Sequence, residues 1–217
     1  GDFNQDGRQD LVTTDFGAGT ASIRLGGCNN PPSITAGGPL TRQAGSAGSS
    51  ATIATVNDNE TAAGSLVVTA TTVPTGITVT DITNSNGTIT ATVTANCIAT
   101  VGANTVVLTV TDGGGATATA NLTVNVTANT APTLIYNNIS VNGGASTTNS
   151  PTTATDNGTI ASYALQSPGT YTGTISVNSS GLVSISNAAP IGNHTITIRA
   201  TDNCGAFTDA SFTLTVN

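Results

Sequence analysis

The sharpest chemical pattern in the sequence is a run of oxygen-bearing side chains at its start. Asp and Asn residues recur there at alternate positions, and a glycine after the third of them permits a sharp turn. Carboxylate, amide and carbonyl oxygens in this number suit a hard cation with six or seven oxygen ligands. We therefore predict a calcium site, the alternative being an Asx-rich turn without metal. The predicted ligands are Asp2, Asn4, Asp6, Arg8 through its carbonyl, and Asp10.

No other pattern carries recognisable catalytic chemistry. His194 is the single histidine, and no serine or cysteine stands in a nucleophile elbow. The triple glycine at 113–115 is not followed by a helical pattern, as a phosphate-binding loop would require. From this we predict that the chain is not an enzyme. The open alternative is that it forms an accessory part of a larger secreted enzyme.

The charge composition argues against two classes of partner. Charged residues make up 7% of the chain, and its four basic residues are scattered arginines. Binding to nucleic acid or to an anionic membrane needs clustered cations, so we predict neither. No apolar run approaches the ~20 residues that span a bilayer, so we also predict no membrane span.

The elements that position these residues are strands, because apolar residues alternate with polar ones along most of the chain. Residues 105–127 align without gaps onto residues 195–217, and each copy reads as two strands joined by a Gly-rich turn. A repeat of about 90 residues with short strands indicates tandem β-sandwiches. We predict an all-β chain with a hairpin at 1–30 and sandwiches at 31–127 and 131–217.

Two resemblances follow from these motifs. The Pro-containing starts at 31–34 and 131–134 and the closing stretch Thr109–Val126 resemble Ig-like and cadherin-like repeats of large prokaryotic surface proteins. The Asp-rich loop and the two short strands of residues 1–26 resemble one FG-GAP/VCBS repeat of calcium-loaded β-propellers. The first resemblance implies spacers, stalks or adhesive modules. The second implies a propeller fragment, or a hairpin that docks on the first sandwich or on a neighbouring chain.

Each predicted sandwich has two further carboxylates at one of its poles. Asp58 and Asp156 end a strand, while Asp112 and Asp202 begin the last turn of each repeat. In an Ig-like fold these loops lie together, so each pair is a possible second metal site. The alternative is an Asx turn, in which the carboxylate accepts nearby backbone N–H groups.

The three cysteines can be placed on the same topology. Cys97 falls at the far pole of the first sandwich, and Cys204 falls in a turn at the near pole of the second. These poles meet in a stacked tandem, so we predict a Cys97–Cys204 disulfide that stiffens the joint. Cys28 is then free or paired with another chain, and three reduced thiols are the alternative.

These features favour a structural role outside the cell. We predict a subunit of an extracellular or cell-surface fibre, stalk or filament that associates with copies of itself through strand pairing. Residues 9–25 would be donated to a neighbour in one version of this hypothesis. The alternatives are an adhesin that recognises glycan or protein, and a spacer of a larger secreted protein.

Overall fold

The computed structural model describes residues 1–3, 9–27 and 29–217. It confirms the all-β prediction: in these residues β-strands are joined by turns, with one short 3₁₀ segment. Asn4, Asp6 and Arg8 of the predicted calcium loop, together with Cys28, lie outside the described residues. Within the described part, no helix is long and apolar enough to cross a membrane.

The first unit is a separate antiparallel hairpin of β1 (Leu11–Asp15) and β2 (Thr20–Arg24). The Asp15 carboxylate closes its turn by accepting the backbone N–H of Gly17 at 2.9 Å. At the open end, the Asp10 carboxylate accepts the N–H of Phe3 at 2.6 Å and of Gly26 at 2.7 Å. Asp10 therefore ties the two chain segments that enter and leave the hairpin.

The first sandwich has two four-stranded sheets, ordered β4-β10-β9-β6 and β3-β5-β8-β7. β4 lies parallel to β10, and the other pairs are antiparallel. Its elements are β3 (Ser33–Ala36), β4 (Leu40–Gln43), β5 (Ser49–Asn57), η1 (Ala63–Ser65), β6 (Val67–Thr72), β7 (Ile77–Ser85), β8 (Thr88–Ala95), β9 (Gly102–Thr111) and β10 (Thr117–Thr127).

The second sandwich repeats this plan. One layer is ordered β12-β19-β18-β15, and the other is divided into the pairings β11-β14 and β13-β17-β16. Its strands are β11 (Thr133–Tyr136), β12 (Ile139–Val141), β13 (Thr147–Asn149), β14 (Pro151–Thr155), β15 (Ile160–Ser167), β16 (Thr174–Val177), β17 (Val183–Ser186), β18 (Gly192–Asp202) and β19 (Phe207–Val216).

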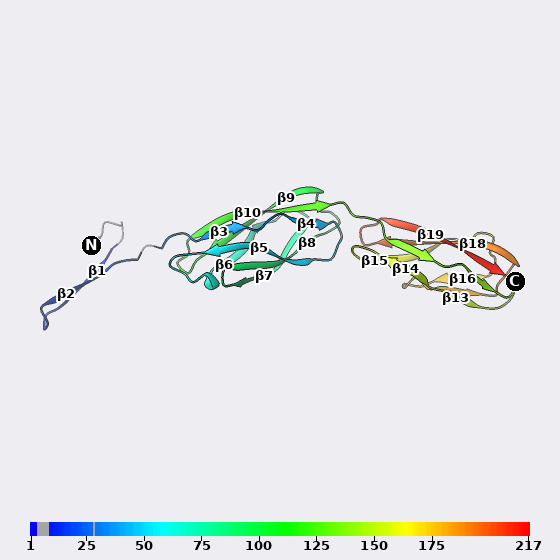
Figure 1. The fold of residues 1–217 in the computed structure, drawn as a ribbon, viewed down its shortest axis with the longest axis horizontal. Coiled ribbons are helices and arrows are strands. Elements are labelled where there is room, and N and C mark those ends of the chain that lie inside the picture. The colour runs from blue at the N-terminus through cyan, green and yellow to red at the C-terminus, as the bar shows by residue number, and fades with distance from the viewer. Residues whose placement is uncertain (4–8, 28) are drawn as a thin grey trace.

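Each sandwich has its own core, formed by the alternating apolar residues of its long strands. Val106 and Leu108 of β9 are fully buried in the first core, and Ile196 and Ile198 of β18 are fully buried in the second. Intervening residues such as Thr109 lie on the outer face, because successive side chains of a strand point to opposite faces. The cores account for two folding units that follow one another along an extended molecule, with the termini at opposite ends (Figure 1).

This packing predicts the effect of truncating the first core. Leu108→Ala removes a fully buried side chain and should lower the free energy of unfolding by about 2–5 kcal/mol. The matched surface variant Thr119→Ala on the neighbouring strand should change it by about 0.5 kcal/mol or less. Urea unfolding followed by circular dichroism measures both; equal losses would contradict the burial assigned to Leu108.

Candidate functional site: the joint between the sandwiches

The joint is organised by Asp202, at the start of the β18–β19 turn. Its side chain is almost fully buried, at 2% exposure. Oδ1 accepts the backbone N–H groups of Cys204 at 2.8 Å and Ala206 at 2.9 Å, which fixes the turn. Oδ2 accepts the side-chain amide of Asn129 at 2.6 Å. One carboxylate thus holds both the turn of the second sandwich and the linker that leads into it.

The same arrangement occurs at the corresponding pole of the first sandwich. Asp112 begins the β9–β10 turn and accepts the N–H groups of Gly114 at 2.8 Å and Ala116 at 2.9 Å. The amide of Asn29 donates to both of its carboxylate oxygens, at 3.2 and 3.0 Å. The turn carboxylate and the preceding asparagine are therefore a repeated device for holding the incoming chain.

Sequence reasoning named Asp112 and Asp202 but missed their asparagine partners. A signal was present, because Asn29 and Asn129 each stand three residues before a proline at the start of a sandwich, Pro32 and Pro132. This signal is weak in a chain rich in asparagine. The contact itself depends on tertiary structure, since each asparagine is more than 70 residues from its carboxylate.

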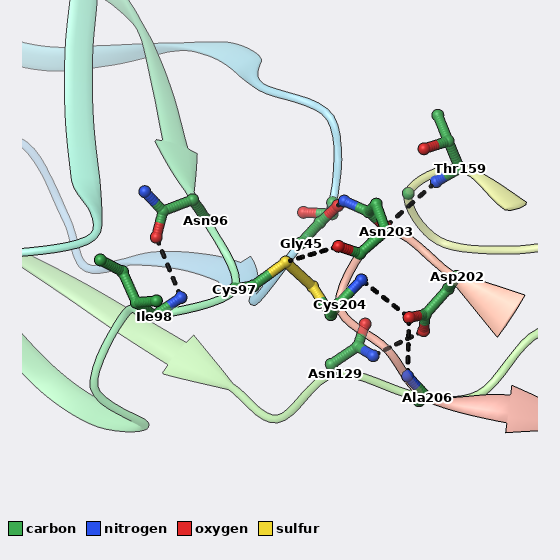
Figure 2. The surroundings of a disulfide bond; sticks show 12 residues. Gly45, Asn96, Cys97, Ile98, Asn129, Thr159, Asp202, Asn203, Cys204 and Ala206 are labelled. Atoms are coloured by element: carbon green, nitrogen blue, oxygen red, sulfur yellow. Dashed lines mark hydrogen bonds between the residues drawn. A yellow bond between two sulfur atoms is a disulfide. The ribbon is translucent and has the colours of Figure 1, made fainter. Parts of the chain in front are cut away.

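A covalent bond and a hydrogen bond cross the joint (Figure 2). Cys97 of the first sandwich is joined to Cys204 of the second by a disulfide, the pair named from the sequence, with an S–S distance of 2.01 Å. Beside it, the side-chain amide of Asn203 donates to the carbonyl oxygen of Gly45 at 2.9 Å. Two consecutive residues of one turn, Asn203 and Cys204, therefore bind two separate segments of the first sandwich, at Gly45 and at Cys97.

Two glycines allow the sandwiches to approach this closely. Gly45 has a φ of 78°, and a Cβ built on it would collide with the Sγ of Cys204. A Cβ on Gly158 of the second sandwich would collide with the Gly45 carbonyl oxygen. The Gly45 backbone therefore lies directly against the Cys204 side chain and the Gly158 backbone, and a larger side chain at either glycine would push the two domains apart.

A third link runs through the linker. The side-chain amide of Gln43 donates to the carbonyl oxygen of Ala128 at 3.1 Å and to the hydroxyl of Thr130 at 3.0 Å. The Thr130 hydroxyl in turn donates to the side-chain oxygen of Asn157 at 3.0 Å. This chain of bonds connects the end of β4, the linker and a loop of the second sandwich.

The remaining predicted metal residues also cap backbone turns. Asp58 accepts the N–H of Thr61, and Asp156 accepts the N–H of Gly158, both at 2.8 Å. All four carboxylates thus make the Asx-type bonds of the alternative interpretation. Among the described residues, no three His, Cys, Asp or Glu side chains come together in one metal-sized group.

The two carboxylate pairs differ in what surrounds them. Three side-chain atoms at the joint are buried without a hydrogen-bond partner: Asn129 Oδ1, Asp156 Oδ1 and Asn157 Nδ2. Such atoms are costly unless a water molecule or an ion satisfies them. The described residues contain no such atom beside Asp58 and Asp112. Among the described residues, unpaired side-chain oxygens therefore occur at Asn129 and Asp156 of this joint and not at the pole of Asp58 and Asp112.

Of the ligands predicted in the N-terminal loop, the structure describes Asp2 and Asp10. Asp10 is buried, at 7% exposure, and each of its carboxylate oxygens already accepts one N–H group. An oxygen of this kind retains a second lone pair for a cation. The donor chemistry of these two residues fits calcium, while the geometry of the loop at residues 4–8 lies outside the described residues.

Comparison with known proteins finds only distant structural likeness. No protein-family model matches the sequence, and no curated protein matches it either. Among solved structures, the chain aligns over 96% of its length with 75% of the EC1-3 fragment of mouse clustered PcdhgC3, at 17% identity and a TM-score of 0.37. It also aligns over 85% of its length with 94% of the fibronectin(III)-like modules of Clostridium thermocellum CbhA, at 18% identity and a TM-score of 0.33.

A further match corrects one prediction. The chain aligns over 96% of its length with an endo-fucoidan hydrolase of glycoside hydrolase family 107, at 17% identity and a TM-score of 0.45. This match contradicts the prediction, drawn from missing motifs, that the chain is not an enzyme. The chain spans 33% of that hydrolase, and this degree of likeness assigns no activity.

The glycine contact gives a matched test of the joint. Gly45→Ala places a Cβ against Cys204, so we expect the sandwiches to separate and the disulfide to form incompletely. Gly144→Ala is the control, because Gly144 has a similar φ of 74° but no atom within 4 Å of its added Cβ. Thiol titration after oxidative refolding measures the result. Equal thiol content in the two variants would contradict the close approach.

The Asp202 carboxylate makes the stability of the second sandwich depend on pH. Burial raises its pKa, but the hydrogen bonds from Asn129 and from the turn N–H groups outweigh burial and lower it. The stabilisation is therefore complete above the unfolded pKa of about 3.9 and is lost as the pH falls through the lower folded pKa. The free energy of unfolding, measured with urea, should fall more steeply between pH 6 and pH 2 for the native chain than for Asp202→Asn. Parallel profiles would rule out this role.

Proposed function

We propose that this chain is a structural subunit of an extracellular fibre, stalk or filament. The joint carries this proposal, because it constrains two sandwiches at several separate points. The Cys97–Cys204 bond, the Asn203–Gly45 bond and the Gln43 contacts with the linker lie on different segments. Bending at the joint must break one of these interactions, so the tandem behaves as one stiff rod.

The chemistry of the chain supports an extracellular location for such a subunit. Disulfides persist in oxidising environments such as the cell exterior and are rare in the cytosol. The outer faces of the sheets carry threonine in place of charge, with hydroxyl pairs such as Thr83–Thr90 at 2.8 Å and Thr71–Thr109 at 2.9 Å. This surface supports a role in which the chain spans distance, with copies of itself as its partners.

A second candidate is an adhesive module for glycan or protein, or a spacer that presents one. The supporting observation is an exposed cluster on the outer face of β18 and β19. The Arg199 guanidinium makes two 2.8 Å bonds to Asp209 and lies 3.6 Å from the ring centroid of Phe207, which is 50% exposed. Arginine and aromatic side chains dominate the binding energy of many interfaces.

We also propose that the N-terminal segment is an FG-GAP/VCBS-type hairpin that binds calcium, and that Asp156 and Asp202 bind a second cation at the joint. When bound, the cation would neutralise carboxylates and satisfy the orphaned oxygens of Asn129 and Asp156. Calcium titration calorimetry should give a Kd of about 10⁻⁴–10⁻³ M, the range of extracellular modules.

Paired variants separate the two calcium proposals. Asp6→Asn should remove the N-terminal binding event and leave any joint event, while Asp156→Asn should do the reverse. Each substitution keeps side-chain volume and removes one charge, and circular dichroism should show an unchanged strand content. If the native chain takes up no calcium at millimolar concentration, both cation proposals fail.

Electron microscopy tests the structural proposal. Negative-stain images of the purified chain should show stiff two-lobed rods that associate into longer assemblies. Reductant should increase the spread of angles between the lobes, because it cleaves the bond across the joint. Isolated rods at every concentration would remove self-assembly as the function and favour the adhesive or spacer candidate, which a glycan array then tests.

A further inference from the structure

The hairpin β1–β2 has no partner within the described chain. Every residue of both strands is exposed to solvent. Val12 and Ile23 are directly opposite each other and share a face with Leu25, and their exposed fractions are 38%, 55% and 54%. An isolated two-stranded hairpin is marginally stable in water at best. Its two unpaired edges are therefore open to a partner strand.

Most edge strands of the described sandwiches are short or irregular. Their outermost strands are very short, such as β12 (Ile139–Val141), or are interrupted by register shifts, as between Thr80 and Thr83 of β7. Asp81 stands at that shift with a φ of 53°. Short strands, bulges and charges at edges are devices that prevent strand addition. By contrast, β1 and β2 pair over five residues without a shift.

The charges of the hairpin are self-complementary. Arg24 lies opposite Leu11, and Asp15 lies opposite Thr20 on the same face. If β1 pairs antiparallel with β1 of a second copy about a twofold axis at Thr13, Leu11 lies opposite Asp15 of that copy. Arg24 then stands two strands from this carboxylate, about 9–10 Å, within reach of its long side chain. Pairing of β2 about Ser22 brings Asp15 and Arg24 into one row in the same way.

The same geometry also extends the opposite face of the hairpin. In either pairing, Val12 and Ile23 lie in line, across the strands, with Thr14 and Ala21 of the second copy. The twofold axis gives the equivalent line, in which Thr14 and Ala21 of the first copy meet Val12 and Ile23 of the second. Both hairpins then gain hydrogen bonds along a former edge. An interface that places one patch against its own copy is the usual form of a symmetric dimer.

We propose that the hairpin binds the hairpin of a second copy of this chain by antiparallel edge-to-edge strand pairing. The proposal rests on the self-association in the proposed function and names the contact that makes it. It differs from donation of residues 9–25 into a neighbouring sandwich, because the acceptor is another hairpin.

Cysteine cross-linking tests this contact in the full chain. Across an antiparallel pair, Cα atoms lie about 4.5–5.5 Å apart, within the range that a disulfide bridges. Thr13→Cys and Ser22→Cys place a thiol on each of the two possible twofold axes. Thr119→Cys, exposed on the outer face of β10, is the control for random collision, and all three carry Cys28→Ser. Non-reducing electrophoresis and peptide mapping read out the products.

We expect one of the two hairpin variants to form linked dimers at least tenfold faster than Thr119→Cys under mild oxidation. Which of them reacts identifies the paired edge. Rates equal to the control for both variants overturn the proposal. Light scattering of the native chain distinguishes failure of the hairpin contact from failure of self-association. If the chain forms oligomers but no hairpin cross-links, only the hairpin contact is rejected. If it is monomeric at all concentrations, self-association is rejected as well.

Discussion

The structure depends on a carboxylate that is buried at the turn between β18 and β19. Asp202 is removed from water at the end of β18, which is favourable only if its lone pairs are satisfied. Two backbone N–H groups and the amide of Asn129 satisfy them. The turn that results presents Asn203 and Cys204 to the first sandwich. The covalent bond across the joint is thus placed by the hydrogen bonds of one side chain.

The repeat shows how a common device is adapted to different tasks. Asp112 and Asn29 reproduce the bonds of Asp202 and Asn129, so both sandwiches hold the chain that enters them. The next two turn residues differ, with Gly113 and Gly114 in place of Asn203 and Cys204. A Cβ on Gly114 would lie 2.5 Å from the Asn29 side chain. The β9–β10 turn of the first sandwich therefore holds its incoming segment but has no equivalent of Asn203 and Cys204, which bind the neighbouring sandwich.

Much of the fold could be predicted from the sequence, because strands and turns are local signals. The alternation that buries Val106 and Leu108, and the turns that follow Asp112 and Asp202, are readable without a structure. The Cys97–Cys204 pair could be named because topology alone brings two poles together. The Asn203–Gly45 bond could not, since it depends on the relative rotation of two domains. The prediction about enzymatic activity failed because it rested on absent motifs.

The stiffness of the joint is most directly tested by residual dipolar couplings from both sandwiches in one aligned sample. A single alignment tensor should fit the backbone N–H vectors of β8–β10 and of β17–β19 with the relative orientation seen in Figure 1. This result is expected because covalent and hydrogen-bonded contacts join the two sandwiches at separate points. Two tensors of clearly different magnitude would show that the sandwiches move independently, and would contradict the account of the chain as one rod.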